Sequence, residues 1–386
     1  MAQTIAPKPS ARLALAALTL LSRARTRRSE HKANASVERI LVVELWNIGD
    51  VILAVPFLAS LRMRFPKAKV TLLARPFAPD LLDKSGLVDD FIAADLDWGY
   101  GWRLGWPRRV GRVWNIAREL RRRNFDLVFS ARQHVRERVL LALSGAKRRV
   151  GFSLGVGDNA LTDIVDLPNE KAHRVDSWMA LLGPFGGAGA APATTLRVSD
   201  EDRVWARGFL LSRGVANDGV VIGIHPGASL PEKRWPVERF REIAYAYSSR
   251  PGFHVLAFVE PPPSNYGEEL FGVSGVIPAQ TTLRQLVALI DRCDLLVCND
   301  SGPMHIAGAL SVPTVAMFGS GIEDWFRPLG EGHEFLRPDA DVSADSRLPS
   351  GYPAVRTPAA IGVSQVKDAV ARVVQRLKSR PKLSSF

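Results

Sequence analysis

Cysteine is scarce in this chain, whose 386 residues include only Cys293 and Cys298. Two thiols cannot build a disulfide framework, and they cannot complete a zinc site alone. A reducing, cytoplasmic setting is therefore the expected location. A membrane-spanning run is also not evident near the N-terminus, where the apolar run Leu13–Leu21 is too short to cross a bilayer. No convincing signal-peptide cleavage site follows that run.

Two common nucleotide-binding motifs are missing as well. No G-x-G-x-x-G follows the first predicted strand, and no G-x-x-x-x-G-K-[ST] occurs in the chain. These absences argue against a dinucleotide-dependent dehydrogenase and against a P-loop NTPase. Asp300 and His305 have no third ligand nearby at metal-site spacing. We therefore expect neither a metal nor another cofactor.

Positive charge, in contrast, is abundant and lies mainly in the N-terminal half. The net charge is +12, and Arg103–Arg149 holds fourteen basic and three acidic residues. A solvated helix face and a nucleic-acid-binding surface are two interpretations of that stretch. Because no RNA- or DNA-binding motif accompanies the charge, we expect an anionic membrane or an anionic acceptor as the partner. We also expect residues 1–36 to form a basic amphipathic extension on acidic lipid, with a frayed segment without a role as the alternative.

Apolar segments alternate with segments of helical periodicity along most of the chain. The predicted strands begin with Ile40–Val43 and restart with Val220–His225, after the Gly- and Pro-rich stretch Gly183–Thr195. This alternation predicts doubly wound parallel sheets, and the Gly- and Pro-rich stretch predicts a linker. We therefore expect two α/β domains, at residues 37–185 and 195–360, with a ligand cleft between them at the carboxyl ends of the strands. A final helix is expected within residues 361–380.

The first of three informative turns is Trp46–Asp50, which joins the first predicted strand to a helix. Gly49 permits a ligand to approach the backbone closely. Asp50 falls at the start of the helix, where a carboxylate is favoured. Two interpretations of Asp50 follow: a helix cap, which stabilises by about 1 kcal/mol, or a general base that faces the cleft.

The other two turns carry groups suited to binding phosphate. His225–Ser229 is followed by Lys233 and Arg234, which can form charge-assisted hydrogen bonds with phosphate oxygens. Asn299–His305 begins a helix, whose first N–H groups and partial positive charge attract anions. The simpler interpretations are a solvated basic pair in a surface loop for the first turn and a buried histidine for the second.

Together the three turns resemble glycosyltransferase family 9, the ADP-heptose:lipopolysaccharide heptosyltransferases. Ile40–Pro56 is similar to the family's N-terminal signature, Ile224–Pro236 to its second block, and Asn299–Gly319 to its third. The blocks follow in family order across residues 38–330. The resemblance implies a GT-B fold of the α/β class, in which two Rossmann-like, doubly wound domains face each other across a cleft. It also implies that the C-terminal helix packs back on the N-terminal domain.

The resemblance further implies roles for individual residues. Asp50 matches the proposed catalytic base, and Asn47 and Gly49 lie beside it as acceptor-binding residues. The residues that match the donor-binding blocks are Ser229, Lys233, Asp300, Ser301, Gly302 and His305. Glu44 differs from the family pattern, which commonly has a basic residue at that position.

The implied reaction is an inverting, metal-independent transfer of a heptose or related sugar. The donor would be a nucleotide-diphosphate sugar, by default ADP-heptose, and the acceptor an anionic, lipid-linked glycan such as the lipopolysaccharide core. Such an enzyme would work in the cytoplasm, in peripheral contact with acidic lipid at the inner face of the inner membrane. The alternative is a non-catalytic protein of the same fold that binds nucleotide sugars or anionic glycans.

Overall fold

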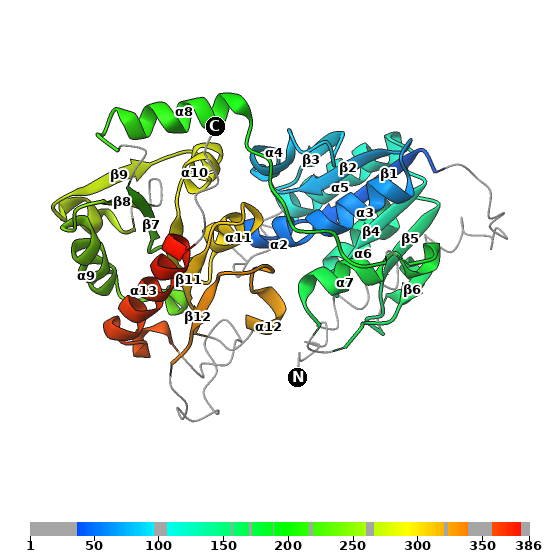
Figure 1. The fold of residues 1–386 in the computed structure, drawn as a ribbon. Helices are drawn as coiled ribbons and strands as arrows, with labels where there is room; N and C mark the ends of the chain where they lie inside the picture. The colour runs from blue at the N-terminus through cyan, green and yellow to red at the C-terminus, as the bar shows by residue number, and fades with distance from the viewer. Residues whose placement is uncertain are drawn as a thin grey trace. The chain divides into compact units, whose positions relative to one another are not determined.

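A computed structural model describes residues 37–95, 106–155, 157–169, 172–187, 189–215, 219–259, 266–319, 323–338 and 357–379, without the side chains of residues 106–110, 135 and 136. The expected extension at residues 1–36 therefore lies outside the described residues. The chain divides into two compact units, unit 1 at Met1–Ala193 and unit 2 at Thr194–Phe386 (Figure 1). This division falls inside the Gly- and Pro-rich stretch that the sequence marks as a linker.

Unit 1 is built on a six-stranded parallel sheet with the strand order β3-β2-β1-β4-β5-β6. Its strands are β1 (Arg39–Glu44), β2 (Lys69–Ala74), β3 (Asp90–Ala93), β4 (Leu127–Ser130), β5 (Arg148–Phe152) and β6 (Asp163–Val165). The apolar run of β1 is buried throughout, as expected for a parallel strand covered on both faces. The strand order reverses between β1 and β4, which pair directly although two strands separate them in the chain.

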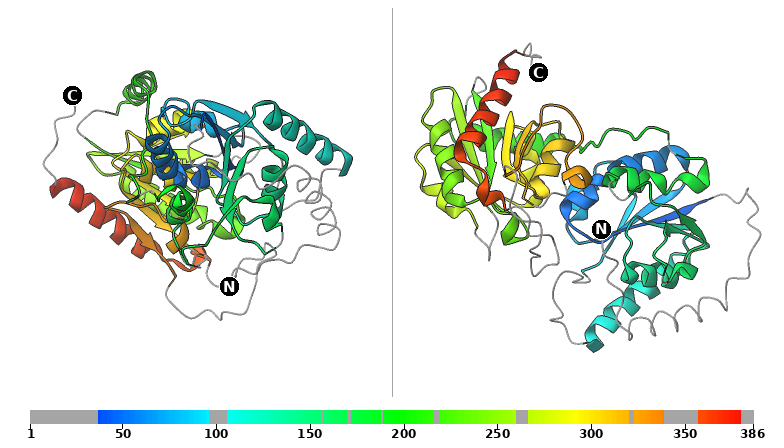
Figure 2. Two further views of the ribbon diagram at one scale, coloured as in Figure 1. Left: turned by 90° about the vertical axis from the view of Figure 1, so that its right-hand side faces the viewer. Right: turned by 90° about the horizontal axis from the view of Figure 1, so that it is seen from below.

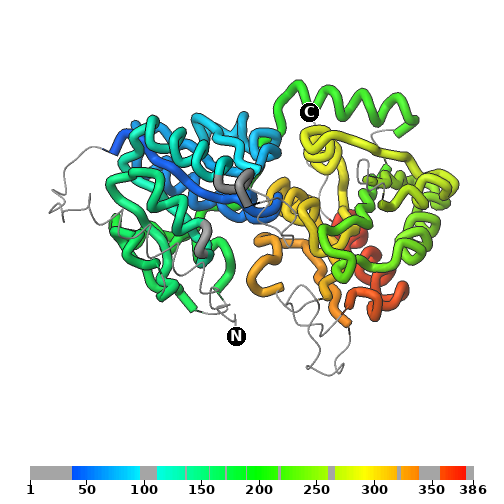
Figure 3. The backbone as a smooth tube through the Cα atoms, turned by 180° about the vertical axis from the view of Figure 1, so that it is seen from behind, coloured from blue at the N-terminus to red at the C-terminus, as the bar shows by residue number. Residues whose placement is uncertain are grey.

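Helices cover both faces of this sheet. They are α2 (Ile48–Leu53), α3 (Val55–Arg64), α4 (Ala78–Leu82), α5 (Trp106–Arg122), α6 (Val135–Leu143) and α7 (Arg174–Ala180). Leu120 of α5 and Leu140 of α6 pack with Leu41 of β1 in one core cluster, on the face seen from behind in Figure 3. On the other face, Phe57 of α3 packs between Phe129 of β4 and Trp178 of α7, with ring centroids 5.1 and 4.9 Å apart. Unit 1 is therefore doubly wound, as the sequence predicts.

Unit 2 repeats the same topology, with the strand order β12-β11-β10-β7-β8-β9 and parallel pairing throughout. Its strands are β7 (Val220–His225), β8 (Phe253–Val259), β9 (Val276–Gln280), β10 (Leu295–Asn299), β11 (Thr314–Met317) and β12 (Glu334–Leu336). Its helices are α8 (Asp200–Leu211), α9 (Val237–Ser248), α10 (Leu283–Ile290), α11 (Gly302–Ala309), α12 (Glu323–Phe326) and α13 (Val363–Ser379). The order reverses between β7 and β10, at the position equivalent to β1 and β4.

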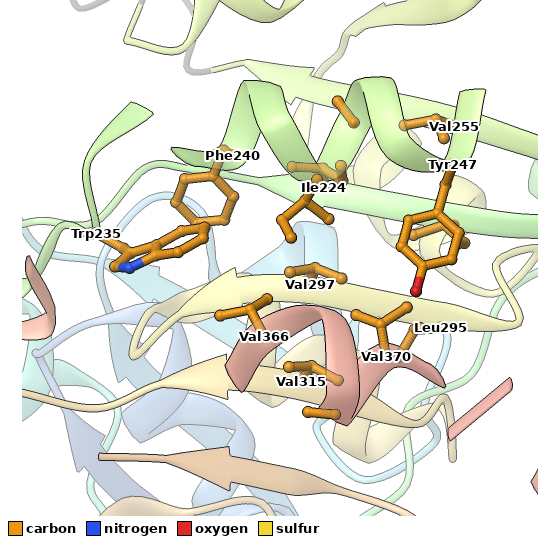
Figure 4. Close-up of a cluster of buried hydrophobic side chains, with 14 of the residues drawn as sticks. Ile224, Trp235, Phe240, Tyr247, Val255, Leu295, Val297, Val315, Val366 and Val370 are labelled. Carbon is orange, nitrogen blue, oxygen red and sulfur yellow. The ribbon is translucent and has the colours of Figure 1, made fainter. Parts of the chain in front are cut away.

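The C-terminal helix α13 belongs to the core of unit 2. Figure 4 shows Val366 and Val370 of α13 against Val297 and Val315 of the sheet, with α9 on the same face. Its apolar stripe is buried against unit 2's own strands, and packing of this helix on the N-terminal domain stays a prediction. The physical reason is that the valines repeat every three or four residues and match the apolar face that β10 and β11 present.

One predicted helix is divided in two. The spacing in the sequence predicts a continuous helix at Val51–Phe65, and the structure instead has α2 and α3 separated at Ala54. Pro56 accounts for the division, because proline lacks an N–H and is accepted in the first turn of a helix. Within the described residues, no helix combines the length and the apolar character needed to span a bilayer.

Candidate functional site

The candidate site residues of each unit lie at the point where its strand order reverses. In doubly wound sheets, ligands bind beyond the carboxyl ends of the strands at this position. In unit 1, the turn after β1 carries Asp50 and the turn after β4 carries Arg132. In unit 2, Lys233 follows β7, and Asp300 follows β10. Each unit thus places polar side chains where its fold binds ligands.

Asp50 of α2 has two partners. Its Oδ2 atom accepts a hydrogen bond from the backbone N–H of Asn47 at 3.1 Å, which is one half of a capping box. Its Oδ1 atom pairs with the guanidinium of Arg132. Gly49 is buried in the first turn of the same helix, and Asn47 is exposed. Asp50 therefore caps the helix through Oδ2, and its Oδ1 atom is held by Arg132.

Arg132 is fixed by neighbours other than Asp50. Its guanidinium carbon lies 4.8 Å from the centre of the Trp46 ring, and its Nε atom lies 3.9 Å from Oε1 of Glu44. The indole N–H of Trp46 donates to Glu137 at 2.8 Å, and Glu137 also accepts from the Ser130 hydroxyl. Because the ring is held at its N–H and covered by the guanidinium, Trp46 and Arg132 form one ordered surface beside Asp50.

Arg174 brings a second guanidinium to the same place. Its Nη1 atom donates to the carbonyl of Ala131 at 2.9 Å, and its Nη2 atom lies 3.9 Å from Oε2 of Glu44. Three carboxyl groups therefore meet two guanidinium groups in a largely buried space, named here the unit 1 charge cluster: Glu44, Asp50, Arg132, Glu137 and Arg174. The cluster has one more acid than base.

Burial affects the pKa values of the two glutamates in this cluster. Glu44 has no exposed surface, and desolvation raises its pKa to about 8, against the opposing effects of Arg132 and Arg174. Burial also raises the pKa of Glu137 above its usual value. Oε2 of Glu44 makes no hydrogen bond, which a neutral carboxyl tolerates better than an anion does. Burial therefore favours the neutral form of Glu44 and also disfavours the anion of Glu137, while Arg132 pairs with Asp50.

Sequence reasoning predicted Asp50 and missed the three residues that surround it. In the sequence, Arg132 and Glu137 are only two members of the charged stretch Arg103–Arg149, and Arg174 lies outside it. A signal for Arg132 was present, because it follows the predicted strand Leu127–Ser130 by two residues. No comparable local signal marks Arg174, which approaches the cluster from α7 at the far end of unit 1's sequence.

In unit 2, Asn299 ties the turn after β7 to the end of β10. Its Oδ1 atom accepts from the backbone N–H of Trp235 at 2.9 Å, and its Nδ2 atom donates to the carbonyl of Pro226 at 2.6 Å. Asn299 has no exposed surface, and neither does the Trp235 side chain, which donates to Ile361 at 2.9 Å. The predicted donor-binding turns are thus brought together by one buried amide.

Lys233 and Asp300 form an ion pair between these two turns. The Nζ atom of Lys233 lies 2.7 Å from Oδ2 of Asp300, and 19% and 7% of the two side chains are exposed. A lysine ammonium carries three N–H donors and a full positive charge, which suit phosphate oxygens. Ser229, in the same loop, is exposed. Arg234 donates to the carbonyl of Ala228 at 2.9 Å and does not join the pair.

The helix α11 starts at Gly302, two residues after Asp300. Ser301 is its N-cap residue, yet the Ser301 hydroxyl donates to the carbonyl of Asn299 at 3.2 Å and does not cap the helix. Gly302 begins the helix, and His305 lies buried within it. The start of α11 therefore has no side-chain cap from Ser301. Because Pro303 carries no N–H and Met304 donates to the carbonyl of Ser301 at 3.1 Å, this helix start attracts an anion mainly through its partial positive charge. Among the residues that the structure describes, no group of three or more His, Cys, Asp or Glu side chains is arranged as a metal site.

Solved structures share this architecture. The chain is similar to the glycosyl transferase family 9 protein of Veillonella parvula, with a TM-score of 0.73, 24% identity and coverage of 89% of this chain and 99% of that one. It is also similar to Escherichia coli ADP-heptose lps heptosyltransferase II, with a TM-score of 0.69, 22% identity and coverage of 89% and 100%. These similarities confirm the expected GT-B class of two Rossmann-like units.

Sequence comparison extends the likeness beyond the fold. Lipopolysaccharide heptosyltransferase 2 of Escherichia coli K12 is 26% identical over 317 residues, which is 78% of this chain and 88% of that protein. The family model of glycosyltransferase family 9 (heptosyltransferase) matches residues 113–349, more than half of the chain. The chain therefore belongs to glycosyltransferase family 9, and it is a glycosyltransferase.

Proposed function

We propose that this protein transfers a heptose or related sugar from a nucleotide-diphosphate donor to a glycan of the lipopolysaccharide core. The observation that carries the donor half of the proposal is the Lys233–Asp300 pair beside the uncapped start of α11, at the reversal point of unit 2's sheet. An ammonium group and a helix start together suit a diphosphate. Ser229, Ser301, Gly302 and His305 complete the proposed donor-binding set.

ADP-heptose is the proposed donor. The support comes from the relatives, since one similar solved structure is described as an ADP-heptose heptosyltransferase and a sequence relative as a lipopolysaccharide heptosyltransferase. Lys233 and the first turn of α11 would stabilise the charge that develops on the departing nucleoside diphosphate. Because these groups supply positive charge themselves, we propose a metal-independent reaction.

Asp50 is the proposed general base. In the proposed reaction it takes the proton of an acceptor hydroxyl, and the hydroxyl oxygen attacks the anomeric carbon as the diphosphate leaves from the opposite side, which inverts that carbon. The hydrogen bond from Asn47 and the Arg132 pair would hold the carboxylate in one orientation.

The proposed acceptor is anionic and lipid-linked, and the proposed location is the cytoplasmic side of the inner membrane in peripheral contact with acidic lipid. The excess of basic residues in unit 1 supports both statements. Asn47 and Gly49 would lie beside the acceptor hydroxyl. Nucleic acid is not proposed as a partner.

A panel of nucleotide sugars tests the donor. We expect ADP-heptose and ADP to raise the melting temperature, by mass action on the folded state, while UDP- and GDP-sugars at the same concentration do not. If only UDP- or GDP-sugars raise the melting temperature, ADP-heptose is not the donor. Release of ADP is then measured in the presence of heptose-deficient lipopolysaccharide core. Release indicates an enzyme, whereas donor binding without release, whichever acceptor is added, supports the non-catalytic alternative.

A further inference from the structure

The helix α5 presents two contrasting sides. Val113, Ile116 and Leu120 repeat every three or four residues and pack into the core of unit 1. The opposite side of the described part of the helix is exposed and is named here the α5 face: Arg112, Trp114, Asn115, Arg118, Arg121 and Arg122. Figure 2 shows α5 at the rim of unit 1.

The charge of the α5 face is hardly compensated. Glu119 is paired with Arg123 at 2.8 Å and lies 4.0 Å from Arg122. Among the described residues, no carboxylate lies within ion-pair distance of Arg118 or Arg121. A positive field therefore extends from this face into solvent, where it attracts anionic surfaces.

An aromatic ring lies among these guanidinium groups. Trp114 is 54% exposed, although tryptophan side chains are mostly buried in folded proteins. Trp114, Ala117, Arg118, Arg121 and Arg122 line a shallow hollow along the helix. Tryptophan favours the boundary between water and acyl chains, and arginine can bury its aliphatic stem there while its head contacts phosphate. The two residue types together fit the headgroup layer of a bilayer.

We propose that the α5 face docks on a bilayer surface that contains anionic phospholipid. This inference deepens the proposed function and rests on it in one respect, because a lipid-linked acceptor requires the enzyme to approach a membrane. It differs from the expectation for residues 1–36, since it assigns the contact to a folded helix of unit 1. The apolar side of α5 is buried in unit 1, so the contact with lipid would come from the arginines, through attraction to anionic headgroups, and from the exposed tryptophan at the interface.

Vesicle sedimentation with the full chain tests the inference. The probe is a vesicle of phosphatidylglycerol and phosphatidylcholine, compared with pure phosphatidylcholine at about 0.1 M salt. The variant Arg118→Gln/Arg122→Gln removes two charges from the α5 face, and Arg207→Gln/Arg241→Gln removes two exposed charges from unit 2 as the matched control. Each basic residue near an anionic bilayer is worth about a fivefold change in affinity, so the first variant should bind about thirtyfold more weakly. The control should match the wild type.

A second variant separates the ring from the charge. Trp114→Ala is expected to weaken binding without changing the net charge, and its thermal unfolding should match the wild type because the ring is half exposed. If Arg118→Gln/Arg122→Gln and the wild type bind anionic vesicles with equal affinity, the inference is overturned. The same result is expected if residues 1–36 carry all the binding. Equal binding to pure phosphatidylcholine would overturn it too. Tighter binding to single-stranded RNA, lost in the same variant, would assign the face to nucleic acid and overturn it.

Failure of this inference and failure of the proposed function give different results. Vesicle binding needs no donor and does not involve Asp50. A chain that transfers sugar but does not sediment with anionic vesicles contradicts the α5 inference alone. A chain that sediments through the α5 face but neither binds nor transfers any nucleotide sugar contradicts the proposed function alone.

Discussion

The guanidinium of Arg132 is paired with the carboxylate of Asp50, although the two residues lie on segments more than eighty positions apart in the chain. The pairing of β1 with β4 brings their turns together. Glu44, the last residue of β1, approaches the same guanidinium at 3.9 Å and has no exposed surface. The environment of the proposed base is therefore set by a buried acid that shares its arginine.

Removal of the proposed base is the first prediction. Asp50→Asn should reduce the rate of sugar transfer about a hundredfold to ten-thousandfold, because proton transfer in the transition state contributes that much. Donor affinity should be unchanged, and the fold should be retained, because the amide oxygen of asparagine can still accept the hydrogen bond from the backbone N–H of Asn47. Asp80→Asn, an exposed aspartate in the first turn of α4, is the matched control. Wild-type turnover in Asp50→Asn would remove Asp50 from the role of base.

Arg132 provides the second prediction. Arg132→Gln removes the ion pair that holds the Asp50 carboxylate in place. The kcat for sugar transfer is therefore expected to fall about tenfold to a hundredfold, with little change in donor affinity, because a misplaced base is less effective. Arg132→Lys keeps the charge and should restore part of kcat, and Arg75→Gln, an exposed arginine of unit 1, should leave kcat unchanged. Wild-type kcat in Arg132→Gln would mean that Arg132 does not position the base.

The third prediction concerns Glu44 and the way the free energy of unfolding depends on pH. Its pKa in the folded chain is raised to about 8 from an ordinary value of 4.5, so the folded state binds more protons than the unfolded state between these values. The contribution of Glu44 to stability is therefore full below about pH 4.5 and is lost as pH rises toward 8. One group of this kind changes the free energy of unfolding by up to about 1.4 kcal/mol per pH unit.

Glu44→Gln tests this directly. The amide has nearly the shape of the carboxyl and does not ionise, so the fall in stability between pH 5 and pH 8 should become shallower by about that slope. Urea unfolding at several pH values measures it, and Glu38→Gln, at an exposed position just before β1, serves as the control. Parallel stability curves for Glu44→Gln and wild type would show that Glu44 is already ionised at neutral pH.

Lys233 gives a prediction for donor binding. Lys233→Ala removes a charge-assisted hydrogen bond to phosphate, which is worth about 1.5–3 kcal/mol, or roughly a tenfold to hundredfold rise in Kd. It also leaves the Asp300 carboxylate unpaired near the diphosphate. Calorimetric titration with the nucleoside diphosphate measures the change. Lys367→Ala, an exposed lysine of α13, should bind as the wild type does, and an unchanged Kd in Lys233→Ala would place the diphosphate elsewhere.

The central strands of both sheets could be predicted from the sequence, and so could the edge strand β3, whereas the edge strands β6, β9 and β12 could not. β1, β4, β7 and β10 are continuous apolar runs because they are covered on both faces. The edge strand β9 contains Pro278 and alternates in burial, and β6 is three residues long. Such segments resemble loops in sequence, since an edge strand needs neither a long apolar run nor every backbone N–H.

The candidate site was predictable to the same extent. Asp50, Lys233 and Asp300 fall in turns directly after predicted strands, so local pattern was sufficient to select them. Arg132, Glu137 and Arg174 reach the cluster through strand order and helix packing, which hydropathy does not encode. The position of α13 shows the same limit, because an apolar stripe predicts that a helix packs but does not say against which sheet.

The buried amide of Asn299 has a mechanical consequence. It bonds to the backbone of both Pro226 and Trp235, so the loop after β7 and the end of β10 are joined on either side of the Lys233–Asp300 pair. Two such loops, if independent, would each lose conformational freedom when a ligand bound, at a cost in affinity. Here that freedom is already lost on folding, so the two turns would present one preformed surface to the proposed diphosphate.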